Sequence, residues 1–370
     1  MQQERKPYRL ILSGGGTGGH IYPAIAVADA FKRRYPDAEI LFVGAEGRME
    51  MEKVPKAGYE VIGLPIAGIQ RRLTWENLKF PFKLWKSLRK AAALIKSFEP
   101  DVAAGFGGYA SGPLLRKAAQ RGVPTILQEQ NSYAGLTNKW LSKKAAKICV
   151  AYEGMEKYFA PEKIVFTGNP VRQDIAVSTS SKQENKAFFG LDADKPCLLV
   201  IGGSLGARTI NKSMLEHVRD IAASGCQVIW QTGKLYFEEM SQKTAACQLK
   251  GVVVKDFIYD MDKAYGAADL VVSRAGALSV SELCLTGLPT ILVPSPNVAE
   301  DHQTKNAEAL QRNDAAVLVT DQDAPEQLGE VIKELLGNPE KRQRMSQNIT
   351  RMGKPNAAEA IVDEIEKLLH

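Results

Sequence analysis

The sequence predicts an α/β protein made of two Rossmann-like domains, each built on a parallel sheet. Short apolar segments alternate with amphipathic helical segments along most of the 370 residues, which is typical of parallel sheets covered by helices on both faces. The pattern starts twice, each time with a strand and a glycine-rich turn, at Ser13–His20 and at Gly202–Ala207. The length also exceeds what one hydrophobic core usually serves.

The first series opens on the strand Arg9–Leu12. The helix that follows its glycine-rich turn has the apolar positions Ile25, Ala28 and Phe31 on one face. The later strands of this half are expected at Ile40–Val43, Val102–Ala104, Thr125–Leu127 and Lys147–Val150.

The second series opens on the strand Cys197–Ile201 and a helix from Ile210. Its later strands are expected at Gln227–Gln231, Gly251–Val254, Leu270–Val272 and Thr290–Val293. The halves join near Gly168–Arg172, and the terminal segment Gly353–His370 is expected to return to the first domain as a helix. We therefore predict one domain from residues 1–171 plus 353–370 and another from residues 172–352.

Open parallel sheets bind ligands outside the carboxyl ends of their strands. If the two domains face each other, both glycine-rich turns border one cleft. Such a cleft suits a reaction between two substrates, one held by each half.

Composition excludes disordered, fibrous and membrane-spanning proteins. The hydrophobic share of 45% and the charged share of 24% are ordinary for a globular chain, and the longest apolar runs are short strands. The start of the chain is polar, so no secretory signal is expected. The five cysteines are odd in number and lack metal-ligand spacing, which predicts core residues in a reducing compartment. We expect a soluble, cytoplasmic protein.

The net charge of +6 is too small to indicate nucleic-acid binding, but its distribution is uneven. Residues 71–96 hold eight cations and one anion, Glu76, and aromatic side chains lie among the cations. A solvated helix face is one interpretation; the aromatic residues favour attachment to an anionic membrane surface. The predicted membrane-surface residues are Arg71, Arg72, Trp75, Lys79, Phe80, Phe82, Lys83 and Trp85.

The first glycine-rich turn has five glycines within residues 14–19 and is followed by His20. Glycines let a backbone approach phosphate, and a helix N-terminus attracts anions. Taken alone, Gly14, Gly16 and Gly19 also fit the G-x-G-x-x-G of a dinucleotide site, with Glu46 after the next strand. A tight turn without ligand is the remaining alternative. His20, at the start of a helix, is a candidate base.

Three further segments of the second half carry polar groups. The second glycine-rich turn offers the Ser204 hydroxyl to phosphate, and Glu282 could bind a ribose diol or form a capping box with Ser279. The segment from Asp301 to Asn306 offers groups for sugar hydroxyls, or is only a polar helix start. D-x-D sequences begin at Asp192, Asp260 and Asp321, as acidic turns often do, so neither a metal site nor a cofactor is expected.

The order of the motifs resembles the MurG family of bacterial UDP-N-acetylglucosamine transferases, in glycosyltransferase family 28. The matching segments span nearly the whole chain: Gly14–His20, Gly105–Pro113, Glu129–Asn131, Gly135–Lys139, Gly168–Arg172, Gly202–Ala207, Ser273–Glu282 and Asp301–Ala307. One departure is Gln128, where the family commonly has His.

The resemblance implies a GT-B fold and an inverting transfer of N-acetylglucosamine to the C4 hydroxyl of the N-acetylmuramyl unit of lipid I. This reaction forms lipid II in peptidoglycan synthesis. The resemblance further implies a peripheral enzyme on the cytoplasmic face of a bacterial cell membrane. Its partners would be UDP-N-acetylglucosamine, undecaprenyl-linked lipid I, the anionic membrane surface and proteins of cell-wall synthesis or division, but no nucleic acid.

Carried over by position, the resemblance implies donor and acceptor residues and a base. The donor residues are Thr17, Gly18, Gly19, Asn131, Arg172, Ser204, Ile258, Ala277, Leu278, Ser279, Val280, Ser281, Glu282 and Gln303. The acceptor residues are Gly14, Gly15, Gly16, Tyr109, Glu129 and Asn138. Within the donor set, Ser204 suits pyrophosphate, the backbone of Ile258 suits uracil and Glu282 suits ribose. His20 is the candidate base for the acceptor hydroxyl, with a carboxylate as the alternative.

Three other functions compete with this one. A UDP-N-acetylglucosamine 2-epimerase shares the fold and nucleotide but needs no basic, aromatic segment. An NAD-binding oxidoreductase leaves the second glycine-rich turn unexplained. A non-catalytic membrane scaffold needs neither Glu282 nor His20.

Overall fold

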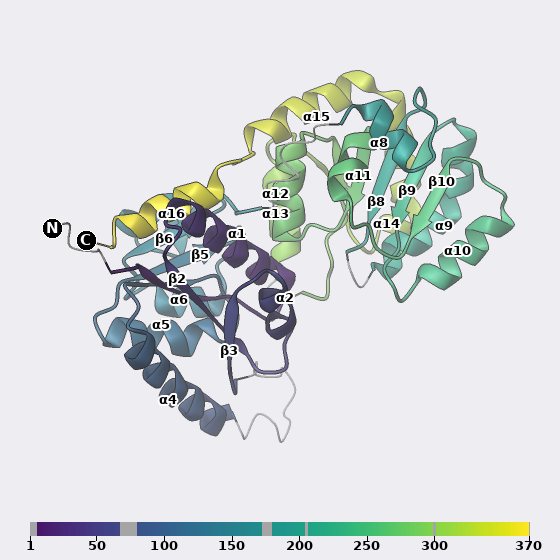
Figure 1. Cartoon of the computed structure of the whole chain (residues 1–370). Coiled ribbons are helices and arrows are strands. Elements are labelled where there is room, and N and C mark those ends of the chain that lie inside the picture. The colour runs from purple at the N-terminus through teal and green to yellow at the C-terminus, as the bar shows by residue number, and fades with distance from the viewer. Residues whose placement is uncertain (1–5, 67–79, 172–179, 204–205, 299–300, 370) are drawn as a thin grey trace. The chain divides into compact units, whose positions relative to one another are not determined.

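The computed structural model describes residues 6–66, 80–171, 180–203, 206–298 and 301–369 (Figure 1). The chain divides into two compact units. Unit 1 comprises Met1–Val171 and Asn356–His370, and unit 2 comprises Arg172–Pro355. Each unit is a parallel sheet with flanking helices, so the predicted fold class of two Rossmann-like α/β domains is confirmed.

Unit 1 contains a seven-stranded sheet of order β3-β2-β1-β4-β5-β6-β7, parallel throughout. Its strands are β1 (Arg9–Ser13), β2 (Glu39–Ala45), β3 (Glu60–Leu64), β4 (Val102–Gly105), β5 (Thr125–Glu129), β6 (Lys147–Val150) and β7 (Ile164–Phe166). Its helices are α1 (Gly18–Arg34), α2 (Glu50–Lys56), α4 (Phe80–Phe98), α5 (Ser111–Gln120), α6 (Leu136–Leu141) and α16 (Ala357–Glu366).

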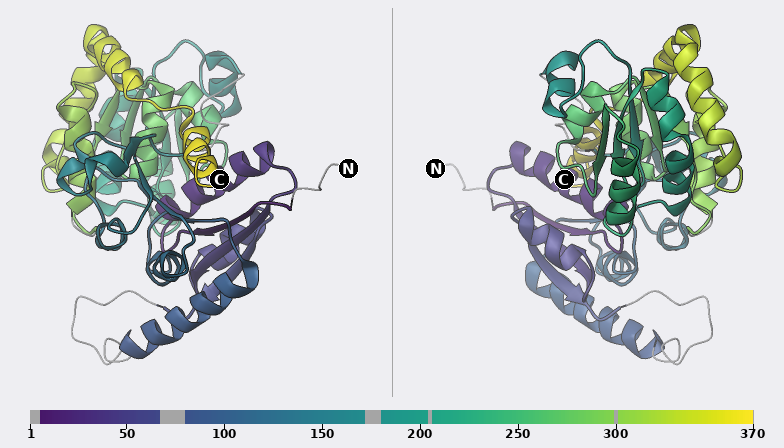
Figure 2. Two further views of the ribbon diagram at one scale, coloured as in Figure 1. Left: turned by 90° about the vertical axis from the view of Figure 1, so that its left-hand side faces the viewer. Right: turned by 90° about the vertical axis from the view of Figure 1, so that its right-hand side faces the viewer.

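Helices cover both faces of this sheet because its central strands are apolar on both sides. Successive side chains of a strand point to opposite faces. Leu10 and Leu12 of β1 therefore pack with α1 and α16, whereas Ile11 packs on the side of α4 and α5. Figure 2 shows α4, in blue, on one side of the sheet and α1 and α16 on the other.

The C-terminal helix α16 packs against α1, as the sequence predicts. Ile361 and Ile365 are buried in the same apolar cluster as Phe31 of α1. At the margin of this contact, Arg34 pairs with Asp363 at 2.6 Å. The apolar contacts supply most of the stabilisation, because exposed ion pairs contribute only about 1 kcal/mol or less.

Unit 2 contains a six-stranded parallel sheet of order β10-β9-β8-β11-β12-β13. Its strands are β8 (Cys197–Ile201), β9 (Gln227–Gln231), β10 (Val252–Lys255), β11 (Leu270–Ser273), β12 (Thr290–Leu292) and β13 (Val317–Leu318). Its helices are α8 (Lys182–Phe188), α9 (Arg208–Ala223), α10 (Phe237–Ala246), α11 (Met261–Ala267), α12 (Ala277–Thr286), α13 (His302–Gln311), α14 (Ala324–Gly337) and α15 (Pro339–Arg351).

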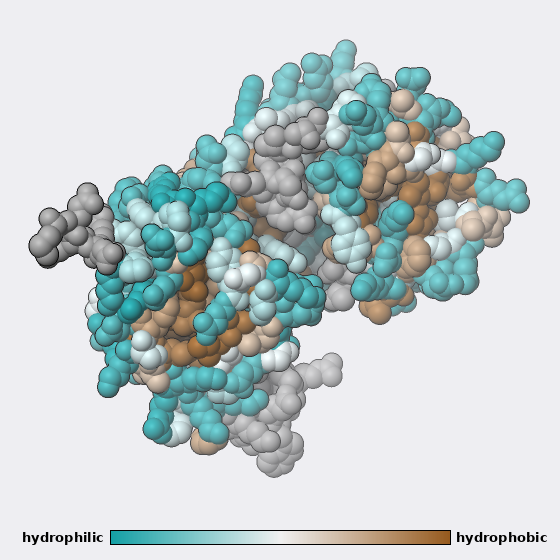
Figure 3. Space-filling view, viewed as in Figure 1, coloured by the Kyte–Doolittle hydropathy of each residue, from teal (hydrophilic) through white to brown (hydrophobic). Residues whose placement is uncertain are grey.

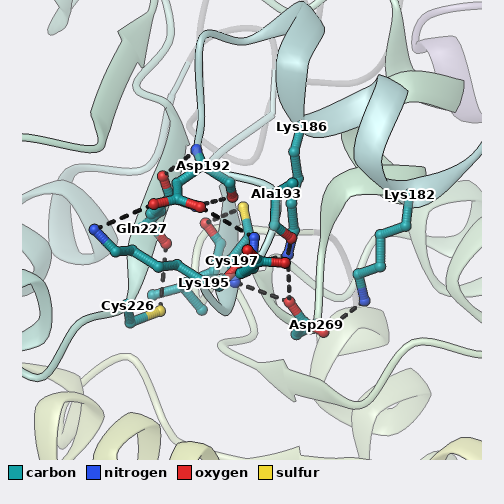
Figure 4. A network of polar contacts seen from close by, with 11 residues as sticks. Lys182, Lys186, Asp192, Ala193, Lys195, Cys197, Cys226, Gln227 and Asp269 are labelled. Atoms are coloured by element: carbon teal, nitrogen blue, oxygen red, sulfur yellow. Dashed lines mark hydrogen bonds and ion pairs between the residues drawn. The ribbon is translucent and has the colours of Figure 1, made fainter.

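A polar network closes the amino ends of the strands of unit 2 (Figure 4). The buried Lys186 ammonium donates to the carbonyls of Ala193 at 3.1 Å and Lys195 at 2.6 Å. Asp269 accepts from the Cys197 N–H at 2.9 Å and pairs with Lys182 at 2.5 Å. The network anchors α8 at the amino ends of the strands, whereas the glycine-rich turn lies at their carboxyl ends.

No helix in the described part of the chain is long and apolar enough to cross a membrane.

Candidate active site

The predicted site residues of unit 1 gather where its strand order reverses, between β1 and β4. Connections from these neighbouring strands leave toward opposite faces of the sheet, which is where open α/β sheets bind ligands. The turn after β4 closes onto β1, because the N–H of Phe106 donates to the carbonyl of Ser13 at 2.7 Å. The Ser111 hydroxyl donates to the same carbonyl at 3.0 Å.

His20 is held against the glycine-rich turn at this point. Its Nδ1 lies 2.9 Å from the carbonyl oxygen of Gly15. A carbonyl only accepts hydrogen bonds, so Nδ1 carries the proton and the lone pair of the neutral ring is on Nε2. The turn after β4 packs against this ring, because a Cβ added at Gly107 would lie 3.0 Å from Nε2.

The buried side chain of Glu50 also holds the glycine-rich turn in place, and our sequence reasoning missed this residue. This carboxylate, only 1% exposed, accepts from the N–H of Gly16 at 3.0 Å and from the N–H of Ala45 at 2.9 Å. A Cβ at Gly15 would lie 2.2 Å from Glu50 Oε1. The missing side chain of Gly15 therefore makes room for a protein carboxylate, and the contact of Gly15 with the acceptor stays a prediction.

The carboxylate of Glu129 organises the loop after β5. It is 2% exposed and accepts from the N–H groups of Asn131 at 3.2 Å and Gly135 at 3.0 Å. The Asn138 amide donates to it at 2.8 Å. Burial raises the pKa of Glu129, and these hydrogen bonds lower it in part. Glu129 and Asn138 thus fix the position of Asn131, whose side chain is more exposed than theirs. The predicted contact of Glu129 and Asn138 with an acceptor stays a prediction.

Gln128 belongs to a buried amide network in unit 1. Its Nε2 donates to Asn169 Oδ1 at 2.8 Å, and Asn169 in turn donates to the carbonyl of Gln130 at 2.9 Å. The Gln130 amide donates to the carbonyl of Phe106 at 2.7 Å and also to Gln128 Oε1. The side chain that departs from the family pattern therefore ties β5 to the turn after β4 and to the exit from β7.

Unit 2 repeats this arrangement between β8 and β11. The turn after β8 leads into α9, and a Cβ at Gly206 would lie 2.2 Å from the carbonyl of Thr232. The turn after β11 closes onto β8 through the N–H of Arg274 and the carbonyl of Ile201, 3.4 Å apart. Both turns lead into helices whose first N–H groups lack intrahelical partners and attract anions.

The capping-box interpretation of Ser279 and Glu282 is wrong. Helix α12 begins earlier, with Gly276 as its N-cap and Ala277 as its first residue, so Ser279 already lies inside the helix. Glu282 instead accepts a hydrogen bond from the Tyr265 hydroxyl of α11 at 3.0 Å. This contact orients a half-buried carboxylate in the middle of α12, and Tyr265 is a second residue that sequence reasoning missed.

Two predicted donor residues have protein partners that fix them. The Ile258 N–H donates to Gln231 Oε1 at 2.9 Å, so this group is already paired with a side chain from the end of β9. The Gln303 side-chain oxygen accepts from the Ser295 N–H at 2.9 Å. Helix α13 is further fixed to the turn before α12, because the Asn306 amide donates to the carbonyl of Ala275 at 3.2 Å.

The D-x-D segments take structural partners. Asp192 exchanges backbone hydrogen bonds with the Gln227 amide, at the amino edge of the sheet. Asp321 pairs with Arg274 at 2.5 Å, and Asp260 pairs with Lys263 at 3.2 Å. Within the described residues, no group of three or more His, Cys, Asp or Glu side chains could hold a metal ion.

One predicted site residue is exposed on the surface of unit 1, and several others lie outside the described part of the chain. Tyr109 is exposed beside the turn after β4. The predicted residues outside the described ranges are Arg71, Arg72, Trp75, Lys79, Arg172 and Ser204.

Two Rossmann-like units, each with a glycine-rich turn at the reversal of its strand order, are the two domains of a GT-B fold. The N-terminal domain of glycosyltransferase family 28 matches residues 10–150, and the C-terminal domain of that family matches residues 197–361. The chain belongs to glycosyltransferase family 28, and its similarities place it among the MurG transferases.

Curated relatives support this placement along the whole chain. A protein of Parabacteroides distasonis is 57% identical, with 98% of this chain and 99% of the relative covered. A protein of Porphyromonas gingivalis is 55% identical, with 100% and 97% covered. Both are named UDP-N-acetylglucosamine–N-acetylmuramyl-(pentapeptide) pyrophosphoryl-undecaprenol N-acetylglucosamine transferase.

Solved structures agree with the relatives. MurG of Acinetobacter baumannii superposes with a TM-score of 0.78 at 29% identity, covering 98% of this chain and all of that one. A UDP-N-acetylglucosamine 2-epimerase of Neisseria meningitidis gives 0.68 at 14% identity, covering 97% and 100%. That second likeness concerns the fold alone. Family membership also decides against the NAD oxidoreductase and the non-catalytic scaffold.

We predict that Glu129 gives the folded protein a measurable pH dependence. Because burial raises its pKa, the folded chain keeps a proton at pH values where the unfolded chain, with a pKa of about 4.3, has lost it. Its stabilising contribution is full below that value and is lost as pH rises through the raised pKa. The free energy of unfolding of wild type, relative to the non-titrating Glu129→Gln, should fall across this window. Parallel curves for the two proteins would contradict the prediction.

Proposed function

We propose that this chain transfers N-acetylglucosamine from UDP-N-acetylglucosamine to the C4 hydroxyl of the N-acetylmuramyl unit of lipid I, which forms lipid II. The observation that carries the proposal is the 57% identity, over 98% of the chain, to the Parabacteroides distasonis protein that is named as this N-acetylglucosamine transferase. Incubation with UDP-N-acetylglucosamine and a short-chain lipid I analogue should yield the disaccharide. Epimerisation of the donor at C2, without transfer, would identify the epimerase alternative instead.

The donor nucleotide fits unit 2 best. The N-termini of α9 and α12, where the first N–H groups have no partner within the helix, are proposed to bind the pyrophosphate. Glu282, oriented by Tyr265, provides a carboxylate for the ribose hydroxyls. The N–H of Ile258 is paired with Gln231, so uracil recognition by this residue would use its carbonyl or require Gln231 to move. Gln303 and Asn131 are proposed to bind the sugar hydroxyls.

The acceptor fits unit 1, where His20 can serve as the base. The acceptor oxygen attacks the anomeric carbon of N-acetylglucosamine, and the bond from that carbon to UDP breaks on the opposite face. The configuration at the anomeric carbon is therefore inverted. The hydroxyl proton passes to Nε2 of His20, which carries the lone pair because Nδ1–H is turned to the Gly15 carbonyl.

The exposed face of α4 supports attachment to a membrane surface. Phe82 and Trp85 are 58% and 50% exposed, although large aromatic residues are usually buried. Lys86 lies 4.5 Å from the Phe82 ring centre, and Arg89 lies 4.8 Å from that of Trp85. The opposite face of α4 packs into unit 1 through Ala91 and Ile95.

Charge and aromatic side chains thus share one stripe of α4, as an interfacial helix requires. On the face turned to the viewer in Figure 3, the atoms at the place of α4 are mostly hydrophilic, and an apolar area lies on unit 1 above them. We infer a peripheral enzyme at the cytoplasmic face of the membrane, where its lipid-linked acceptor lies. Contacts with other proteins of cell-wall synthesis or division would be made there as well.

The first variant test concerns the base. His20→Ala should lower kcat by about 10²–10⁴-fold, because proton transfer in the transition state is lost. The dissociation constant of UDP, measured by calorimetry, should barely change. His217→Ala in unit 2 is the matched control, since it removes a histidine whose contact is the carbonyl of Pro325. A parallel loss of UDP affinity in His20→Ala would instead assign this residue to binding.

The second concerns nucleotide recognition. Glu282→Ala should raise the KM for UDP-N-acetylglucosamine strongly, because each hydrogen bond to a charged group contributes roughly 1.5–3 kcal/mol. Initial rates over a range of donor concentrations measure the effect. Glu308→Ala is the control, as it removes an α13 carboxylate that only approaches Arg312 at 3.9 Å. An unchanged donor KM in Glu282→Ala would rule out the proposed ribose contact.

The third concerns the membrane. Replacing Lys86 and Arg89 by Gln should weaken binding to anionic vesicles by at most about 2 kcal/mol, since each cation near the surface contributes about 1 kcal/mol. This loss should vanish at high salt, where charge is screened. Replacing Phe82 and Trp85 by Ala should weaken binding at every salt concentration. Vesicle sedimentation measures both effects, and Lys243→Gln in unit 2 is the control. Wild-type binding by both double variants would place the membrane contact elsewhere.

A further inference from the structure

One peptide group of the first glycine-rich turn connects two functional side chains of unit 1. The peptide between Gly15 and Gly16 offers its carbonyl to His20 Nδ1 at 2.9 Å and its N–H to Glu50 Oε2 at 3.0 Å. Glu50 and His20 therefore bind opposite ends of the same planar group. A shift or rotation of this peptide at one end must alter the contact at the other end, because the peptide bond is rigid.

Glu50 is itself fixed from two sides. Its second carboxylate oxygen accepts from the N–H of Ala45, the last residue of β2, at 2.9 Å. The side chain passes between two glycines: a Cβ at Gly15 would lie 2.2 Å from Oε1, and a Cβ at Gly44 would lie 2.3 Å from Cγ. The position of the carboxylate is thus set by the sheet and transmitted to the turn.

Both oxygens of Glu50 act as acceptors, and this requirement is specific to a carboxylate. A glutamine of the same shape would turn its NH₂ group toward one of the two backbone N–H groups. One hydrogen bond would be lost, and a buried donor would be left unpaired.

We propose that Glu50 is a positioning residue that holds the His20 imidazole, through the Gly15–Gly16 peptide, with its proton on Nδ1 and its lone pair on Nε2. Glu50 touches neither substrate. Its contribution is to fix the carbonyl that selects the tautomer and the orientation of the ring. In catalysis this role rests on the proposed function, in which Nε2 takes the proton of the acceptor hydroxyl.

The role is distinguishable from plain stabilisation of the fold. A structural carboxylate would affect the melting temperature alone, whereas a positioning residue must also change the histidine ring. Glu364→Gln is the matched control, because Glu364 of α16 is another largely buried carboxylate of unit 1. Its partner is Lys367, the residue that follows α16.

The primary measurement is the tautomer of His20 by ¹⁵N NMR of histidine-labelled protein. The chain has four histidines, so comparison with His20→Ala assigns the signal. Wild type at a pH where the ring is neutral should show a protonated Nδ1 and an unprotonated Nε2. Glu50→Gln should show a mixture of tautomers or a shifted Nδ1 signal, whereas Glu364→Gln should match wild type. A wild-type ring protonated on Nε2, or a His20 signal unchanged in Glu50→Gln, would overturn the proposal.

Kinetics provide the second measurement. Glu50→Gln should lower kcat by about 10- to 100-fold, since small misplacement of a catalytic group has effects of this size, and should leave the UDP dissociation constant unchanged. The NMR result does not depend on activity, so failure of the proposed function would not mask it. If transfer occurs and Glu50→Gln retains wild-type kcat, the positioning role is refuted.

Gly44→Ala tests the same contact if Glu50→Gln does not fold. The added Cβ would push on Glu50 from β2 without changing charge or touching the glycine-rich turn. It should reproduce the change in the His20 signal. The ¹³C shift of the Glu50 carboxyl group shows whether Glu50 is displaced in folded Gly44→Ala. If Glu50 is displaced and the His20 signal is unaltered, the proposal is contradicted.

Discussion

The turns that leave the carboxyl ends of β1 and β4 must pair their backbone groups without the help of a helix or strand. Buried N–H and C=O groups are costly when left unpaired. In unit 1 this requirement is met by contacts from distant segments: Glu50 accepts from Gly16, His20 contacts Gly15, and Ser111 donates to Ser13. The position of the candidate base, the shape of the turn and the packing of the loop after β4 all depend on these contacts.

The sequence predicted most of the architecture because the central strands carry their own signal. Cys197–Ile201 and Gln227–Gln231 are continuous apolar or β-prone runs, and their predicted bounds match β8 and β9. The edge strands β3, β7 and β13 were not predicted. β7 and β13 are three and two residues long and only partly buried, so neither length nor hydrophobicity distinguishes them from loops. β3 has five residues, but Glu60 and Gly63 weaken its strand pattern.

The site was predicted less completely, because its contacts join residues far apart in the sequence. Glu50 begins a short helix and looks like an ordinary surface acid; only its pairing with Gly16, 34 residues earlier, shows its role. The amide pair of Gln128 and Asn169 is separated by 41 residues. Pattern reasoning also misplaced the start of α12. One of the two interpretations of Ser279 made it an N-cap, whereas the extended backbone of Gly276 begins the helix one turn earlier.

The two glycine-rich turns differ in what lies beneath them, and this difference separates their chemistry. Beneath the first lies a carboxylate that takes the N–H of Gly16, so a phosphate near this turn would meet a nearby acidic group and one fewer donor. Beneath the second, Gly206 packs against the neutral carbonyl of Thr232. There Arg274 forms an ion pair with Asp321, which also accepts from the Thr209 hydroxyl of α9 at 2.8 Å, so the pair ties the start of α9 to the turn after β11 without adding net charge. The first turn therefore has one N–H fewer to offer an anion, because Gly16 already donates to Glu50. This difference is the reason that the proposed function assigns the donor pyrophosphate to the second turn and the orientation of the imidazole to the first.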